Sequence, residues 1–181
     1  MVAHQAALGI MPRSSSAVLV AVRGPRESPC LLDRRQLELV GEQLPAQAYH
    51  AAATLDLDEA SRVIQQWATA ASTAADRGIT DVLSGPAKGY RVVGVGIVAT
   101  VREVPALATV LRSHPLLHTA EGQLAREVLA EAAERARLPV HYLAPKGPHE
   151  PEHAELAEAM RHEAGAGARN TSWQPSRHLP C

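Results

Sequence analysis

Two histidines and a glutamate near position 118 have the residue types and the spacing to do chemistry together. His114, His118 and Glu121 are separated by four and then three residues, and side chains three or four apart lie on one side of an α-helix. Burying ionisable groups is costly unless they are paired or put to use. Yet farther along the helix the same side carries only apolar residues, namely Ala125, Val128, Leu129 and Ala132.

This inward row has three alternative interpretations. Imidazole and carboxylate ligands suit zinc, and three such ligands with an open water position would make a catalytic centre. Without a metal, His114 or His118 could act as a general base oriented by Glu121, or could bind a ligand. In the third alternative the row is structural, and Glu121 pairs with an arginine. No residue is therefore assigned as a metal ligand, and the cofactor stays unknown, with zinc or magnesium as the divalent metals to consider.

A second group of charged residues lies on a strand with alternating character. In residues 30–40 the positions of Asp33 and Arg35 fall on the same face as Leu31, Leu37 and Leu39. Charged groups on a mainly apolar face need partners, and a pairing of Glu121 with Arg35 and of Asp33 with a histidine would supply them. An inward arginine would also suit a phosphate or carboxylate ligand.

His50 is a further candidate, because a short strand near residues 47–50 could carry it to the same site. The expected roles divide into two groups. Catalytic roles are expected for His114, His118, Glu121 and Asp33, with one of the histidines as general base. Substrate binding is expected for Arg35 and His50.

The elements that must position these residues can be read from hydrophobic periodicity and turn residues. Asp56 and Glu59 predict a capping box that opens a helix, and Gly78 is expected to end it. A long helix is expected from Pro115 to about Arg137. Strands are predicted at 17–22, 30–40, 91–101 and 140–143, with a short helix at 105–112.

This order predicts an α/β fold, with a mixed sheet of about five strands and flanking helices. The strand at 17–22 is expected to be the first of the sheet and to run parallel to the last two. Residues 17–146 would form a single domain. Residues 1–16 are interpreted as a disordered leader, and 147–181 as a mostly disordered tail with a short helix near 152–163.

Composition restricts the partners and the location. The chain has 18 basic and 19 acidic side chains and a formal net charge of −1, without the basic stripe of a duplex-binding protein. Tight, unassisted binding of nucleic acid is therefore disfavoured, although an anionic small molecule or a nucleic acid remains the expected partner. No convincing signal peptide or membrane span is seen, so a cytoplasmic protein without membrane contact is expected. Nothing in the sequence indicates an oligomeric state.

Two stretches resemble a known family. The small-residue helix around Ala120–Arg126 and the following Leu138-Pro139-Val140-His141-Tyr142-Leu143-Ala144-Pro145-Lys146 are similar to the RuvC-type Holliday junction resolvases. The resemblance implies a ribonuclease H-like fold. It also implies carboxylates that hold two divalent metals for attack on a phosphodiester.

The sequence departs from that family where its chemistry is done. The resemblance implies an aspartate on the first strand, a glutamate at the end of the fourth and aspartates on the final helix. Residues 17–22 and 91–100 contain no acid, and Glu103 lies just beyond the second of these stretches. Either the chain is a degenerate, non-catalytic interaction domain, or its chemistry, as a hydrolase, has moved to Asp33, His114, His118 and Glu121. Only the last position has possible substitutes, Glu152, Glu155 and Glu158.

Overall fold

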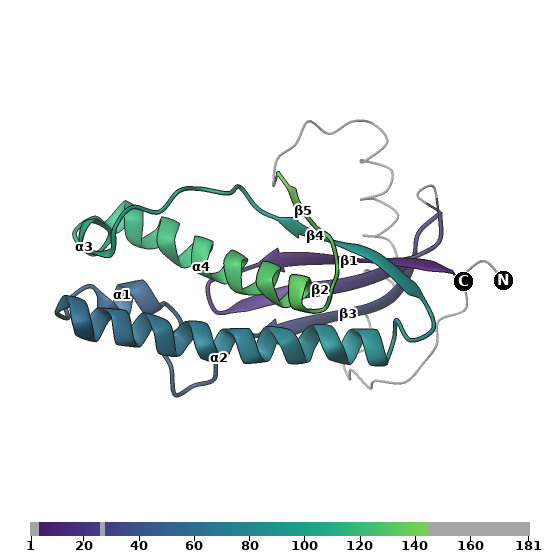
Figure 1. Cartoon of the computed structure of the whole chain (residues 1–181), viewed down its shortest axis with the longest axis horizontal. Helices are drawn as coiled ribbons and strands as arrows, with labels where there is room; N and C mark the ends of the chain where they lie inside the picture. The colour runs from purple at the N-terminus through teal and green to yellow at the C-terminus, as the bar shows by residue number, and fades with distance from the viewer. Residues whose placement is uncertain (1–3, 26–27, 145–181) are drawn as a thin grey trace, which may run out of the picture.

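The computed structural model describes residues 4–25 and 28–144, which form one sheet and four helices (Figure 1). The helices are α1 (Ala48–Ala52), α2 (Leu57–Ser84), α3 (Leu107–Val110) and α4 (His114–Arg135). The strands are β1 (Gln5–Pro12), β2 (Ser16–Arg23), β3 (Cys30–Glu38), β4 (Arg91–Val98) and β5 (Val140–Leu143).

The five strands form a mixed sheet in the order β3-β2-β1-β4-β5. β1, β2 and β3 make an antiparallel meander, in which Ile10 pairs with Leu19 and Leu19 pairs with Arg35. β4 runs parallel to β1, and β5 runs parallel to β4. Parallel neighbours need a crossover connection, and α2 and then α3 with α4 supply the two crossovers.

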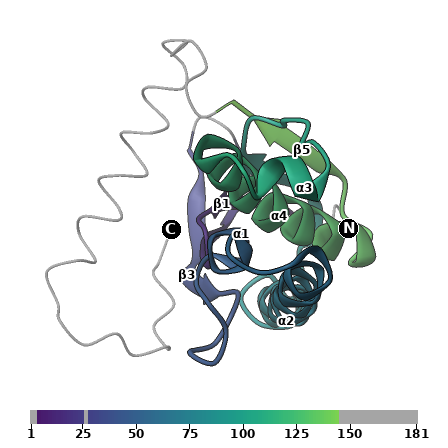
Figure 2. The same cartoon turned by 90° about the vertical axis from the view of Figure 1, so that its left-hand side faces the viewer.

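The two long helices lie side by side on one face of this sheet (Figure 2). The core between these helices and the sheet contains the inward residues of β1 and β4, such as Leu8, Ile10 and Ile97. Trp67 of α2 and Leu129 of α4 pack against them. Trp67 is fully buried. Much of the remaining helix surface in the core is alanine, so the helices can approach the sheet and each other closely.

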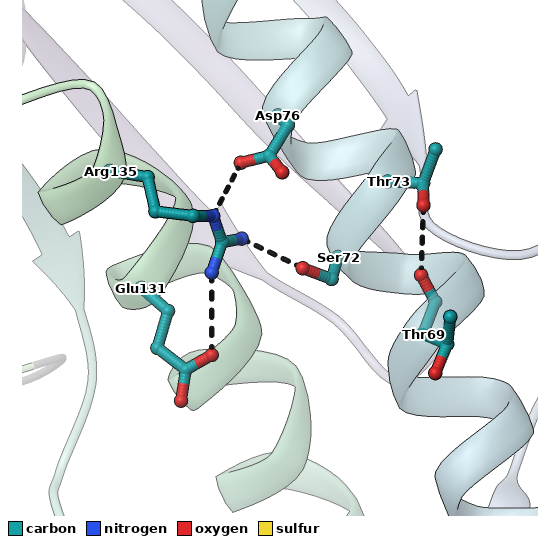
Figure 3. Close-up of polar contacts among 6 residues, drawn as sticks. All are labelled: Thr69, Ser72, Thr73, Asp76, Glu131 and Arg135. Carbon is teal, nitrogen blue, oxygen red and sulfur yellow. Dashed lines mark hydrogen bonds and ion pairs between the residues drawn. The ribbon is translucent and has the colours of Figure 1, made fainter.

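A polar contact fastens α2 to α4 near the end of α4 (Figure 3). The guanidinium of Arg135 donates to Asp76 Oδ1 over 3.0 Å and to Ser72 Oγ over 2.7 Å. It also lies 3.6 Å from Glu131, one turn earlier on α4. These groups are largely exposed, so the contact fixes the relative orientation of the helices more than it stabilises the fold.

The expected leader is the largest correction. Residues 5–12 are not a loose segment but β1, the central strand of the sheet, and β1 is the strand that lies parallel to β4. The strand at 17–22 is instead the middle of the meander and runs antiparallel to β1. The physical reason is a period of two: Ala6, Leu8 and Ile10 are buried, and small or polar residues separate them.

Two further expectations were wrong locally. Residues 47–50 do not form a strand, because Ala48–Ala52 is the short helix α1. Gly78 does not end α2, which continues to Ser84. A Cβ atom at Gly78 would lie 2.7 Å from Leu37 Cδ1, so this glycine lets the helix pass close to β3.

The fold class is confirmed, with a mixed sheet of five strands and flanking helices. The start of α2 is also confirmed, because the Asp56 side chain accepts a hydrogen bond from the backbone N–H of Glu59. The expected tail and the short helix predicted near 152–163, including Glu152, Glu155 and Glu158, lie outside the described residues. No helix in the described part of the chain is long and apolar enough to cross a membrane.

Candidate functional site

Three histidines gather where α1 meets the first turns of α4. The ring centroid of His50 lies 4.5 Å from that of His118 and 5.5 Å from that of His114, and the last two rings are 4.6 Å apart. One ligand nitrogen from each ring lies within 4.8 Å of the others. His114 and His118 are exposed, and His50 is partly buried. We call these three side chains the imidazole cluster.

Glu121 is buried beneath this cluster and holds α1 in place. Its Oε1 atom accepts hydrogen bonds from the backbone N–H groups of Tyr49 (2.7 Å) and His50 (3.1 Å). The same oxygen lies 3.3 Å from Nδ1 of His50. The first N–H groups of a helix lack partners within the helix and attract negative charge, and α1 has no side-chain cap of its own. Glu121 therefore caps α1 from another helix and orients the His50 ring.

A small apolar cluster positions α1 and α3 against the start of α4. Val110 of α3 is fully buried, and Leu117 and Ala120 of α4 are nearly so. Tyr49 of α1 and Ala53, the residue after α1, pack against them. Both α1 and α3 are too short to be stable alone, so this packing and the Glu121 cap are what bring His50 to α4.

Asp33 and Arg35 do not join the imidazole cluster. They lie on the face of β3 that points toward the helices, because their pairing partners Ala21 and Leu19 are buried. The Arg35 guanidinium donates to Asp33 Oδ2 over 2.5 Å, so the two charges compensate each other at the sheet edge. The expected pairs of Glu121 with Arg35 and of Asp33 with a histidine are therefore wrong.

The sequence placed His114, His118 and Glu121 on one side of a helix, and all three lie in the first turns of α4. Glu121 differs from the others in contact and burial: it is 2% exposed and faces α1. His50 does reach the cluster, but from a helix and not from a strand. No local spacing could have revealed this, because the contact is made by tertiary packing alone.

The comparisons with known proteins bear on the fold. No protein-family model matches the chain, and no curated protein matches it in sequence. A solved structure of RuvC from T. thermophilus, in complex with a Holliday junction substrate, is similar with a TM-score of 0.51 and 17% identity. The match covers 90% of this chain and 80% of that chain. The fold is ribonuclease H-like.

A second polar group on α4 of this ribonuclease H-like domain was missed. Gln123, which was not among the candidate residues, is 9% exposed. Its side chain accepts from Arg126 (3.1 Å) and from the backbone N–H of Arg102 (3.4 Å), and it donates to Glu127 (2.9 Å). Burial lowers the pKa of Arg126, and nearby Arg102 lowers it further. This group ties the segment after β4 to α4, and its spacing of three and four residues was the signal available in the sequence.

Tyr49 gives a prediction for alkaline pH. Burial raises the pKa of its phenol, and the nearby charges of Glu127 and Glu121 raise it further. A folded-state pKa above the unfolded value, about 10, contributes stability that is present below that value and is lost as pH rises through the folded pKa. When the pH is raised from about 8 to about 11, the melting temperature of Tyr49→Phe should therefore fall by less than that of the parent protein. Equal losses in the two proteins would contradict the assignment.

Proposed function

We propose that this domain binds and hydrolyses a phosphate-bearing substrate at the imidazole cluster. The observation that carries the proposal is the convergence of His50, His114 and His118 from two helices, with Glu121 beside Nδ1 of His50. Histidine changes charge near neutral pH, so such rings can bind phosphate as cations and move protons as neutral bases. The exposure of His114 and His118 leaves them open to a substrate.

The roles follow from burial and contact. His50 is held by Glu121, a positioning residue, and its ring would bind a phosphoryl oxygen. In the proposed step the neutral ring of His118 takes a proton from water, and the water oxygen attacks phosphorus. The bond from phosphorus to the leaving oxygen then breaks, and a protonated His114 ring gives its proton to that oxygen. Asp33 and Arg35 take no part in this step, because they pair with each other on β3.

The test uses p-nitrophenyl phosphate and bis(p-nitrophenyl) phosphate as substrates of the full chain. His118→Ala and His114→Ala should each lower turnover by about 100-fold or more, the usual contribution of a positioned acid or base. His141→Ala is the matched control, because His141 is also exposed but lies on β5. Turnover that is absent in the parent, or that survives both cluster variants, would overturn the proposal.

Cleavage of four-way DNA junctions with magnesium is not expected from the isolated protein. The parallel neighbours β1 and β4 end at Met11-Pro12 and Ile97-Val98, and neither strand contains an aspartate or glutamate. Two magnesium ions need oxygen ligands, chiefly carboxylates. Labelled junction incubated with the protein and magnesium should therefore stay intact on a denaturing gel. Junction-specific cuts under these conditions would contradict this expectation.

A non-catalytic interaction domain is the second candidate. It is favoured by the contact of Glu121 with the backbone of α1, which would serve the fold whether or not a reaction takes place. A nucleic acid is then a reasonable partner, because RuvC in the similar structure is in complex with a Holliday junction substrate. Junction binding in a gel-shift assay, together with absent phosphate-ester hydrolysis, would favour this second function over the first.

A further inference from the structure

The imidazole cluster has the composition of a metal site. His114 and His118 are four residues apart on one helix, the spacing at which two histidines of a helix can share a zinc ion. His50 supplies a third ring from α1, and one nitrogen of each ring lies within 4.8 Å of the others. We propose that His50, His114 and His118 bind a zinc ion, with the fourth position open to water.

Glu121 supplies an independent observation. Zinc-binding histidines usually donate their second ring N–H to a carboxylate or carbonyl, which fixes the ring and its tautomer. Glu121 Oε1 lies 3.3 Å from Nδ1 of His50, which leaves Nε2 as the ring atom for a ligand. His50 Nε2 is buried and has no hydrogen-bond partner, and the same is true of Glu121 Oε2. A buried imidazole nitrogen without a partner is costly, and a metal ion would satisfy it.

The choice of zinc follows from the ligand atoms and the charge. Magnesium prefers oxygen ligands, whereas three imidazole nitrogens suit zinc and its neighbours in the transition series. The buried carboxylate of Glu121 lies next to this position and partly compensates the charge of a divalent ion. Zinc–nitrogen bonds of about 2.0 Å in a tetrahedron place the nitrogens roughly 3.3 Å apart. The rings must therefore close slightly, and the two exposed histidines can rotate to do so.

A zinc ion with three histidine ligands and an open position lowers the pKa of its bound water. It would therefore supply the nucleophile for the hydrolysis proposed above, and this use of the metal rests on that proposed function. The metal site itself does not. If the zinc-bound water is the nucleophile, the three rings act as metal ligands, and His118 is not the general base.

Zinc binding is tested on the full chain after treatment with a chelator, by calorimetric titration with zinc chloride. Cobalt(II) is titrated in parallel, because its visible spectrum reports tetrahedral nitrogen ligands. We expect one strongly bound zinc ion per chain. His118→Ala and His114→Ala should each weaken binding by about 100-fold or more, and Glu121→Gln by about 10-fold or more, as expected for ligands and for an outer partner. His141→Ala should leave the affinity unchanged.

The outcomes separate this inference from the proposed function. Absent zinc binding, or binding that survives both His114→Ala and His118→Ala, overturns the metal site, since other histidines would then hold the ion. Because His114 and His118 are exposed, their variants should fold, and circular dichroism checks this. Zinc binding without phosphate-ester hydrolysis keeps the metal site and rejects the hydrolysis. Hydrolysis in excess chelator by a protein that binds no zinc keeps the hydrolysis and rejects the metal site.

Discussion

Removal of residues 1–12 is expected to abolish cooperative folding. β1 is the central strand, with hydrogen-bonded neighbours on both sides, and its Leu8 and Ile10 side chains are almost fully buried. If β1 is removed, the strands β2 and β4 each lose a hydrogen-bonded neighbour. The core under α4 also loses the buried side chains of this strand. Burial of Ile10 alone contributes several kcal/mol, judged from the typical 2–5 kcal/mol cost of truncating such a side chain. The truncated chain should show no cooperative thermal transition by circular dichroism.

Two point variants in β1 provide matched controls for this prediction. Ile10→Asp would bury an unpaired charge and should also prevent folding. Met11→Gln, at the next position, should change stability by less than about 0.5 kcal/mol, because Met11 is 50% exposed. A truncated chain that melts cooperatively near the parent temperature would mean that the first strand is dispensable.

Glu121→Ala is expected to have the second large effect. The substitution leaves the N–H groups of Tyr49 and His50 and the His50 ring without their acceptor. An orphaned buried polar group costs about 1–3 kcal/mol. Because water can hydrate part of α1 in the variant, the free energy of unfolding should fall by less than the full sum, roughly 2–5 kcal/mol. At about 2–4 °C per kcal/mol, the melting temperature should fall by roughly 4–20 °C.

His118→Ala and Glu134→Ala are the controls for this loss. Both residues are exposed on α4, so each change should shift stability by only about 0.5 kcal/mol. Melts of the three variants in the presence of a chelator exclude any effect of bound metal. If Glu121→Ala melts like these controls, the cap on α1 contributes nothing and the carboxylate must have another role.

Sequence patterning predicted the fold where local signals were strong. β2 and β4 are nearly continuous apolar runs, and Asp56 opens α2 as a cap should. β1 was missed because Gly9, Met11 and Pro12 mask a strand whose only β-branched residue is Ile10. Gly78 was wrongly predicted to end α2, because a glycine is also needed where the helix packs closely on Leu37 of β3. Only the tertiary structure reveals that contact.

The candidate site divides in the same way. A spacing of four and three residues on one helix was enough to group His114, His118 and Glu121. It could not indicate that Glu121 faces α1, or that His50 arrives there, because both facts depend on how a five-residue helix docks. Asp33 and Arg35 were correctly placed on the inner face of a strand, but each found its partner two residues away.

The cap on α1 makes attachment of this helix and integrity of the site a single equilibrium. One carboxylate oxygen holds both the backbone of α1 and the ring that α1 contributes, so His50 leaves the cluster whenever α1 detaches. A ligand that binds all three rings binds the protein more tightly when α1 is docked than when α1 is detached. It therefore shifts the equilibrium toward the docked state by the difference between these two binding free energies. Amide exchange in residues 48–52 would therefore slow as the site fills, and a short, weakly anchored helix would report occupancy of a site on its neighbour.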